Sequence, residues 1–556
     1  MLKASPYSDS HAIWRSDETT VLCRVAEMIE TLTFLDQIES VRPPGAAKRE
    51  TKALFLMALR FRDGLDDCLE GIESDAFLLD EDELDELAIA LTELAEDLHA
   101  DAGLWRSLEA YHQEFFGVSL PLLCKPGDPA LQTFDARRFQ FFLYSVWRHF
   151  RPDHIVSPEH RGFQAVARFA SKYFSRAFAA QPQWSAVADF LAKPNRRGWE
   201  VKRKLVWLGT RSFLFRFALN DYMRRQEVKP DQEITATDDF LCQQCTEWSG
   251  LGVVDILAPA LDLPDADRAV LRGWYERHAA FYRIESLNVR GSQVETLDAV
   301  NLINDQTYRV RVELDRKTCA FQSGQMVYGS LVPWHDEWYW SGTQKTWENP
   351  PRDFSSVKRE FREKSSFIAY RYCPDLAQRA REFAAEHFAD FVRFHGSDLA
   401  LFPNGLSAAA AEQKRLRVFS EIKAGEDLEK ILKKHGVKRP GQGNYPRKFV
   451  ENEKGVAVFY HEGEGVEMFT GYGILLSGLK KQDEPLTPDE MEILQAFVEE
   501  DAISPAFVRR VIRDVGSSGL EKLYFLTSGA DGVEYLLRRF KGCYYRKRPP
   551  NISLRE

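Results

Sequence analysis

Along residues 285–347 apolar and polar positions alternate, whereas most of the remaining chain repeats its apolar residues every three or four positions. Residues 307–314 show the alternation most clearly. Charged side chains there separate the apolar residues Tyr308, Val310, Val312 and Leu314. Alternation of this kind is typical of a half-buried strand. The pattern therefore predicts a small β-module within a mostly helical protein.

Five short strands are expected in this module. They are predicted at residues 282–289, 294–298, 308–314, 325–333 and 337–341. Asn304-Asp305 and Ser323-Gly324 supply turn residues between them. Five strands in so short a segment favour a small closed barrel of SH3 or OB type, because closure leaves no exposed sheet edge.

Helices are predicted before the module. Within residues 80–98 one apolar stripe is formed by Leu84, Leu87, Leu91, Leu94 and Leu98. Residues 134–225 carry many aromatic side chains at helical spacing, which favours a helical core. The interleaved arginines, such as Arg137 and Arg138, leave base stacking beside phosphate contacts as the alternative.

Helices resume after the module, and a break is predicted at residues 405–417. Pro403, Gly405 and an alanine run precede basic residues there, a composition typical of an exposed linker. The residues that follow predict strands at 455–461 and 467–472 and helices at 487–500 and 505–515.

These patterns predict an α+β protein. Its parts are a mostly helical N-terminal region at 1–282, a central small antiparallel β-barrel (SH3/OB-like) at 283–347, helices packing on the barrel at 348–404, the linker at 405–417 and a separate α+β C-terminal domain at 418–556.

Composition narrows the class of protein. The chain has 556 residues, 44% of them hydrophobic, and a net charge of −10, which argues against a nonspecific DNA coat. It shows neither an apolar leader nor an apolar run of about 20 residues, so we expect a cytoplasmic protein without membrane contact. Its scattered cysteines do not suggest a disulfide framework.

Motifs for chemistry are incomplete. Cys242 and Cys245 form a CxxC pair, a weak metal candidate, but no second pair follows at the spacing of a zinc site. Histidines 149, 154 and 160 flank two prolines and leave a metal-dependent hydrolase as an alternative. No nucleophile elbow, phosphate loop or dinucleotide fingerprint is present. We therefore expect no enzyme activity, no metal and no cofactor.

Three groups of residues are candidates for interaction. Trp338 and Trp340 share one face of a predicted strand and Tyr339 takes the other, so a helix or a partner is expected to cover one face. A basic loop suited to an acidic partner contains Lys433, Lys434, Arg439 and Arg447. The predicted linker offers cleavage candidates at Leu406, Lys414, Arg415 and Arg417.

Several segments resemble uncharacterised bacterial proteins. They are His278-Ala-Ala-Phe281-Tyr282-Arg283, Tyr308-Arg-Val, residues 324–333, Trp340-Ser-Gly342, Phe394-His-Gly-Ser-Asp398, Phe402-Pro403 and the closing Tyr535-Leu-Leu-Arg-Arg-Phe-Lys-Gly542 with Arg546-Lys-Arg-Pro549. Such proteins often carry a metal-binding SEC-C tail. This chain lacks the cysteine-rich motif of that tail, so the resemblance implies neither a metal site nor an activity.

The overall size and the unequal division at residues 405–417 give a second resemblance, in layout. The chain is similar to the substrate protein of type III-E CRISPR systems, which an RNA-activated, caspase-like protease cuts and which restrains a sigma factor. This resemblance implies a protease and a transcription regulator as partners.

The sequence thus predicts a non-catalytic cytoplasmic regulatory or adaptor protein that acts through protein contacts in a bacterial antiviral or stress pathway. One alternative is a nucleic-acid-associated protein that uses the barrel, and the other is the metal-dependent hydrolase. We expect protein partners and no nucleic-acid partner.

Overall fold

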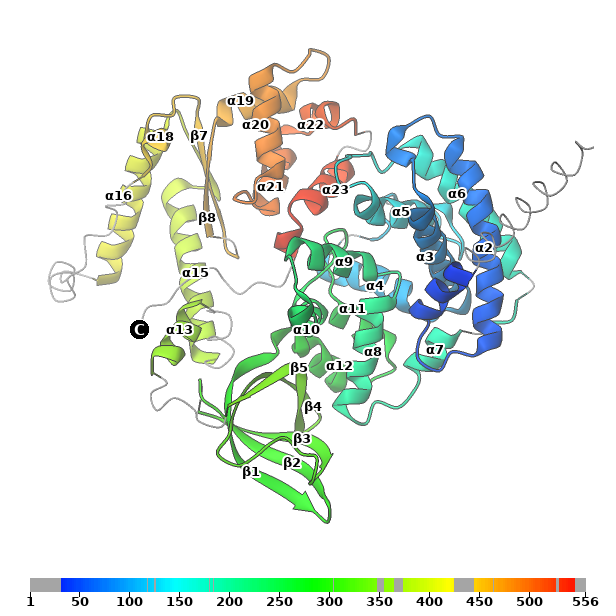
Figure 1. Cartoon of the computed structure of the whole chain (residues 1–556). Helices are drawn as coiled ribbons and strands as arrows, with labels where there is room; N and C mark the ends of the chain where they lie inside the picture. The colour runs from blue at the N-terminus through cyan, green and yellow to red at the C-terminus, as the bar shows by residue number, and fades with distance from the viewer. Residues whose placement is uncertain are drawn as a thin grey trace, which may run out of the picture.

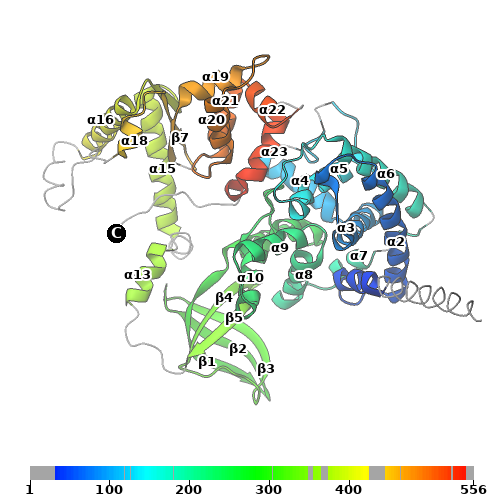
Figure 2. The ribbon, with the colours of Figure 1, turned by 45° about the horizontal axis from the view of Figure 1, so that its top comes forward.

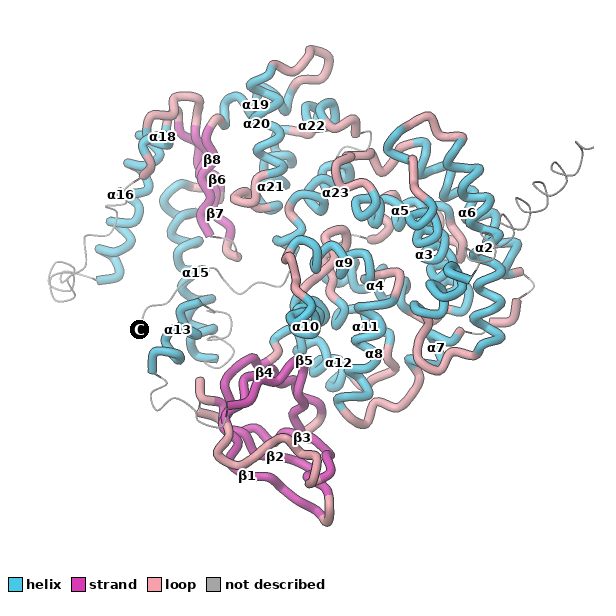
Figure 3. Tube along the Cα trace, in the orientation of Figure 1, coloured by secondary structure: helices cyan, strands magenta, loops and turns pink. Residues whose placement is uncertain are grey.

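The computed structural model describes residues 32–545 apart from 118, 125–126, 180, 184, 304, 348–354, 365–373, 425–444, 464 and 527–529. Figure 1 shows three parts: a helical unit (residues 32–276), a β-module (278–347) and a C-terminal unit (374–545). Figure 3 separates the helices of the first part from the strands of the second. The expected mixed α+β class is confirmed.

The helical unit holds one large apolar core. Its helices are α2 (Lys48–Glu70), α3 (Glu81–Ala100), α4 (Leu104–Phe116), α5 (Ala136–Phe150), α6 (Arg161–Phe178), α7 (Ala186–Leu191), α8 (Gly198–Arg211), α9 (Arg216–Arg225), α10 (Glu233–Gln243), α11 (Val253–Ala260) and α12 (Asp265–Arg272). None of the helices that the structure describes combines the length and apolar character needed to cross a membrane.

Helix α3 illustrates how local sequence sets these elements. Asp80 accepts a hydrogen bond from the Glu83 backbone N–H, and the Glu83 side chain accepts one from the Asp80 N–H, which is a capping box. The predicted leucine stripe faces the core, and four of its five members are fully buried.

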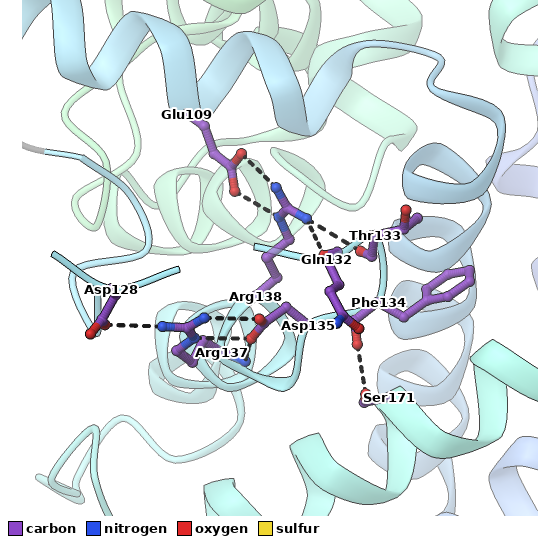
Figure 4. Close-up of polar contacts among 9 residues, drawn as sticks. All are labelled: Glu109, Asp128, Gln132, Thr133, Phe134, Asp135, Arg137, Arg138 and Ser171. Atoms are coloured by element: carbon purple, nitrogen blue, oxygen red, sulfur yellow. Dashed lines mark hydrogen bonds and ion pairs between the residues drawn. The ribbon is translucent and has the colours of Figure 1, made fainter. Parts of the chain in front are cut away.

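The arginines at the start of α5 pair with carboxylates (Figure 4). Arg137 bonds Asp135 and Asp128, each at 3.0 Å, and Arg138 binds Glu109 through two nitrogens at 2.8 and 3.1 Å. The hydrogen bond from Arg137 holds the pKa of Asp135 below its ordinary value. These arginines are therefore already neutralised, and the aromatic residues of α5 lie in the core, as the helical spacing predicts.

The five strands of the β-module follow the closed order β1-β2-β3-β5-β4. They are β1 (His278–Arg290), β2 (Gln293–Asn301), β3 (Thr307–Asp315), β4 (Met326–Trp334) and β5 (Glu337–Trp347), each close to its predicted position. All neighbours are antiparallel except β3 and β5, whose parallel contact is the single bridge Val310↔Trp338. A wholly antiparallel arrangement was the expectation, and the return of β5 beside β3 corrects it.

Strand β5 has two buried faces, as its aromatic pattern predicts. Trp338 and Trp340 pack inside the module, where Trp338 meets Tyr308 edge to face with ring centroids 4.7 Å apart. Tyr339 faces the helical unit and meets Trp199 of α8 at 5.4 Å. The second face of β5 is therefore covered by α8 of the same chain, and this contact holds the β-module against the helical unit.

The C-terminal unit is a three-stranded sheet, ordered β6-β7-β8, between two groups of helices. Its elements are α15 (Pro374–His395), β6 (Leu399–Phe402), α16 (Gly405–Ala424), α18 (Arg447–Val450), β7 (Val456–His461), β8 (Gly465–Thr470), α19 (Tyr472–Lys480), α20 (Pro488–Glu499), α21 (Pro505–Val515), α22 (Ser518–Leu523) and α23 (Ala530–Phe540). The predicted strands and the α20 and α21 helices are confirmed.

The predicted linker at 405–417 is wrong, because these residues form the first turns of α16. Ala408 and Ala409 are buried, and so is Arg415, whereas Leu406 is 63% exposed. Arg415 bonds Asp390 of α15 at 3.0 Å and Glu412 at 2.9 Å. The layout resemblance depended on an exposed linker here, and the helix removes that feature.

The boundary predicted at residue 404 is also corrected. Strand β6 pairs with β7, and α15 packs against β7 and α16, so the C-terminal unit begins by Pro374. Only α13 (Ser355–Lys364) of the helices described between the module and α15 reaches the module, through a Lys358–Asp305 ion pair.

The C-terminal unit is not separate from the helical unit, because α23 docks against helices α4 and α5 (Figure 2). Tyr535 lies edge to face with Tyr144, with centroids 4.7 Å apart, and belongs to the helical core. Tyr545, just beyond α23, meets Phe116 at 5.9 Å. The last helix of the C-terminal unit is thereby joined to α4 and α5 of the helical unit.

Candidate functional site

A recess lies where α23 meets the helical unit, and we call it the junction pocket. It has a volume of about 880 Å³, counting its open mouth. Its walls are α5, α9, residues 244–248 and α23. Side chains that lie far apart in the sequence therefore line one site.

Helical spacing explains the lining. On α5, Phe141, Tyr144 and Arg148 follow one another at intervals of three and four and so share a face. On α23, Tyr535 stands one turn before Arg538 and Arg539. Each helix thus contributes aromatic side chains near the floor and arginines in its last turn, where the helix dipole favours a positive charge.

The floor of the junction pocket is aromatic. Phe141 meets Trp248 edge to face at 5.8 Å, and Tyr535 lies 6.1 Å from Phe141. Burial raises the pKa of Tyr144 to about 12, so its hydroxyl stays protonated at neutral pH. Flat, apolar side chains of this kind suit an apolar ligand body.

Positive charge predominates in the walls. The charged lining residues are Arg148, Arg225, Arg538, Arg539 and His149 against Asp221 and Glu247. Glu247 accepts hydrogen bonds from both Arg148 and Arg225 and so lies between them. One carboxylate is thus shared by two guanidinium groups, and Arg538 pairs with Glu534 behind the lining at 3.0 Å. The excess of positive charge therefore lies at Arg539 and at the Arg148–Arg225 pair.

Arg539 is the least compensated of these groups. Its Nη2 donates to the backbone carbonyls of Pro152 and His154 at 3.2 and 2.9 Å, while its Nε is buried without a hydrogen-bond partner. It forms no ion pair with any residue that the structure describes. Burial and the neighbouring charge of Arg148 lower the pKa of Arg539, and both effects would be relieved by a bound anion.

His149 lies in the pocket wall between two carboxylates. Its Nδ1 is 2.8 Å from Asp221 and its Nε2 is 3.8 Å from Glu86. Burial alone would lower the pKa of His149, but the hydrogen bonds to Asp221 and Glu86 outweigh it and raise the pKa to about 9. His149 is therefore a charged side chain at neutral pH, with both nitrogens engaged.

This pairing predicts a pH dependence of stability. A histidine pKa raised from about 6.5 in the unfolded chain to about 9 stabilises the fold fully below pH ~6.5, and the gain is lost as pH rises through 9. Between these pH limits, the free energy of unfolding of the wild type should fall by about 2–3 kcal/mol relative to that of His149→Gln. Urea unfolding of both proteins at pH 6.5 and 9.5 measures the difference. A constant difference would show that folding does not raise the pKa of His149.

The histidine cluster does not form a metal site. His160 accepts a hydrogen bond from the Gly162 N–H and stacks on Phe77, so it caps α6. His154 serves the pocket only through its carbonyl. In the part of the chain that the structure describes, no three His, Cys, Asp or Glu side chains are grouped to hold a metal ion. The geometry gives the hydrolase alternative no ligand set.

The CxxC pair is divided between core and pocket. Cys242 is buried, and burial raises the pKa of its thiol to about 11. Cys245 lines the junction pocket. A thiol with so high a pKa is a poor nucleophile at neutral pH.

The other predicted interaction residues do not converge on the pocket. Trp338 and Trp340 lie inside the β-module. Lys433, Lys434 and Arg439 fall outside the described residues. Arg447 is 87% exposed on α18 and pairs with Glu451.

One comparison with known proteins gives a match. A family model described as "Protein of unknown function (DUF3843)" matches residues 70–321. The matched segment is less than half of the chain. It runs from the end of α2 past β3 and includes three walls of the junction pocket, but not α23. No curated protein and no solved structure matches the chain.

Sequence reasoning singled out His149 and Cys245 as metal candidates but missed the arginines and aromatic residues that line the pocket with them. Arg538 and Arg539 entered the sequence analysis only as part of the closing segment that carries the family resemblance. Their convergence was not visible, because Tyr144 and Tyr535 are 391 positions apart. Only the docking of α23 brings them together.

Proposed function

We propose that this protein is a non-catalytic regulatory protein whose effector is a small molecule with an anionic group on an apolar, flat body, bound in the junction pocket. The observation that carries the proposal is the excess of arginine over carboxylate around an aromatic floor. Arginine is well suited to carboxylates, sulfonates and phosphates because its nitrogens form a planar fork.

A regulatory role is proposed because the walls of the junction pocket belong to two different units of the protein. The effector touches α5 and α9 of the helical unit together with α23 of the C-terminal unit. A ligand that binds only the docked arrangement stabilises docking. Its occupancy would thus set how firmly the C-terminal unit is held, and hence which of its surfaces a protein partner meets.

Binding is favoured over catalysis because the groups that could react are already engaged. Both nitrogens of His149 face carboxylates, Glu247 lies between two guanidinium groups, and burial keeps Cys242 protonated. A general base or nucleophile needs a free atom directed at the substrate.

We further infer that the β-module is an OB-type barrel acting as a scaffold. The closed strand order with one parallel contact supports this Greek-key assignment. The outer face of β1, β2 and β3 gives the nucleic-acid alternative little support, because three of its arginines have acidic partners. These pairs are Arg309 with Asp298, Arg290 with Glu295, and Arg311 with Glu337.

The test uses two fluorescent probes that differ in charge. 8-Anilinonaphthalene-1-sulfonate carries an anion on an aromatic body, and N-phenyl-1-naphthylamine is its uncharged counterpart. We expect the sulfonate to bind about tenfold more tightly, since one charge-assisted hydrogen bond contributes about 1.5 kcal/mol. In Arg539→Gln the advantage should disappear.

Arg513→Gln is the matched control, because Arg513 is 70% exposed on α21 and lies outside the pocket. It should leave both affinities unchanged. Equal binding of the two probes to wild-type protein, or a sulfonate affinity that Arg539→Gln leaves intact, would refute the proposal.

A further inference from the structure

The sheet of the C-terminal unit has an open edge at β8. Its order β6-β7-β8 makes β6 and β8 the two edge strands, and α15 and α21 pack on its two faces (Figure 3). Among the described elements, only β7 runs alongside β8. The main chain of residues 466–470 therefore borders no other described element on its outer side, and we call it the β8 edge.

The hydrogen bonds at the two sides of β7 show which backbone groups of this edge are unpaired. On the β6 side, the Tyr460 N–H donates to the Asp398 carbonyl at 2.9 Å. On the β8 side, the Gly471 N–H donates to the Gly455 carbonyl at 2.9 Å. Bonded and non-bonded positions alternate along an antiparallel pair, so residues 467 and 469 are the positions that bond β7. Residues 466, 468 and 470 direct their N–H and C=O groups outward, where no described residue bonds them.

The two edges of the sheet are protected to different degrees. Strand β6 has only four residues, Pro403 follows it, and the Leu399 N–H donates to Ser397 Oγ at 3.2 Å. Short strands and proline are common protection against the pairing of sheet edges. Strand β8 has six residues, with neither proline nor lysine, and its Val466 is 45% exposed. The longer and less protected edge is thus the one suited to pairing.

The outward residues of β8 are complementary to themselves. In an antiparallel pairing of two β8 edges, only the register with Met468 opposite Met468 of the second copy pairs all three outward residues. Val466 then lies opposite Thr470, so the exposed valine gains an apolar neighbour.

Glu467, the charged residue of β8, is compatible with this register. Its carboxylate accepts a hydrogen bond from the Ser504 N–H at 2.8 Å, at the start of α21, and is thereby held on its own unit. In the register about Met468, Glu467 lies opposite Phe469. A shift toward the β7–β8 hairpin would place two Glu467 carboxylates opposite each other, which is unfavourable.

We propose that the β8 edge pairs with the β8 edge of a second copy of this chain, antiparallel and about a two-fold axis at Met468, so that the two sheets become one. The pairing supplies an acceptor for each outward N–H group. It uses both β8 edges and leaves only the protected β6 edges free, so assembly stops at the dimer. This interface is independent of the junction pocket and of the function proposed for it.

Sedimentation equilibrium of the full chain tests the proposal, and the wild type should show twice the 64.0 kDa mass of one chain. Met468→Pro removes an outward N–H and leaves the bonds to β7 in place, since proline is tolerated at such edge positions. Two hydrogen bonds are lost between the two copies. The dissociation constant of the dimer should therefore rise about thirtyfold, the effect of two bonds of about 1 kcal/mol each.

Val466→Lys is the second variant and decides the matter if Met468→Pro does not fold. It puts a charge on the β8 edge at an exposed position and should also weaken the dimer. Leu401→Lys is the matched control, because Leu401 is 55% exposed on the other edge strand, β6, and it should leave the dissociation constant unchanged. A monomeric wild type would overturn the proposal and leave the edge to a strand of another protein. A dimer that Val466→Lys leaves intact, or that Leu401→Lys weakens equally, would overturn it as well.

Discussion

Replacing Tyr535 by alanine is expected to undock α23 from the helical unit. The side chain is 1% exposed and packs against Tyr144 and Phe141. Removing a buried aromatic ring costs about 3–5 kcal/mol, because it loses apolar burial and leaves a cavity. The backbone amide hydrogens of α23, and of the helices that it contacts, should then exchange with solvent much faster.

Hydrogen exchange followed by mass spectrometry measures this at α23 and at α5. Phe525→Ala is the control, since Phe525 belongs to the same unit but is 83% exposed, and it should change stability by less than about 0.5 kcal/mol. Tyr535→Phe, which keeps the ring, should remain docked. Unchanged protection of α23 in Tyr535→Ala would mean that other contacts hold the two units together.

The second large effect is expected at Arg415 of α16. Its side chain is 3% exposed, and its partners Asp390 and Glu412 are 4% and 2% exposed. Arg415→Met would leave Asp390 with Arg393 at 2.7 Å and Glu412 with His395 at 2.8 Å, so the loss of the guanidinium that joins the two carboxylates should cost about 3 kcal/mol, the lower end for a broken buried pair. The α15–α16 pair should therefore loosen, with a lower midpoint in urea.

Arg417→Met provides the comparison, because Arg417 is 62% exposed and its pair with Glu421 contributes at most about 1 kcal/mol. Limited trypsin gives a second readout. The wild-type chain should resist cleavage at Lys414 and Arg417, whereas Arg415→Met should be cut there. Rapid cleavage of the wild type at these positions would contradict the helical packing of α16.

The local pattern of residues was sufficient to predict those elements whose stabilising contacts are made between residues close in the sequence. The alternation in β3 predicts its strand, and Thr487 with Pro488 predicts the start of α20, where the structure has a capping box with Glu490. Each signal comes from a few adjacent residues, so no knowledge of the tertiary fold was needed.

Helix α16 shows where local pattern was insufficient. The glycine and the alanine run suggested a linker, but alanine is the best helix former, and small side chains allow close packing against β6 and β7. Arg415 looked exposed because its partner Asp390 is contributed by another helix. The junction pocket was unpredictable for the same reason, since its arginines become a site only when α23 is docked.

The position of α23 along the chain has a consequence for biosynthesis. All the helices that it contacts leave the ribosome earlier, so the aromatic floor of Phe141, Tyr144 and Trp248 stays open to water until α23 emerges. A chain that terminates before Ala530 would keep this apolar groove uncovered. Such a product should be recognisable to chaperones and quality-control proteases, and docking of α23 would remove the exposed apolar surface that they bind.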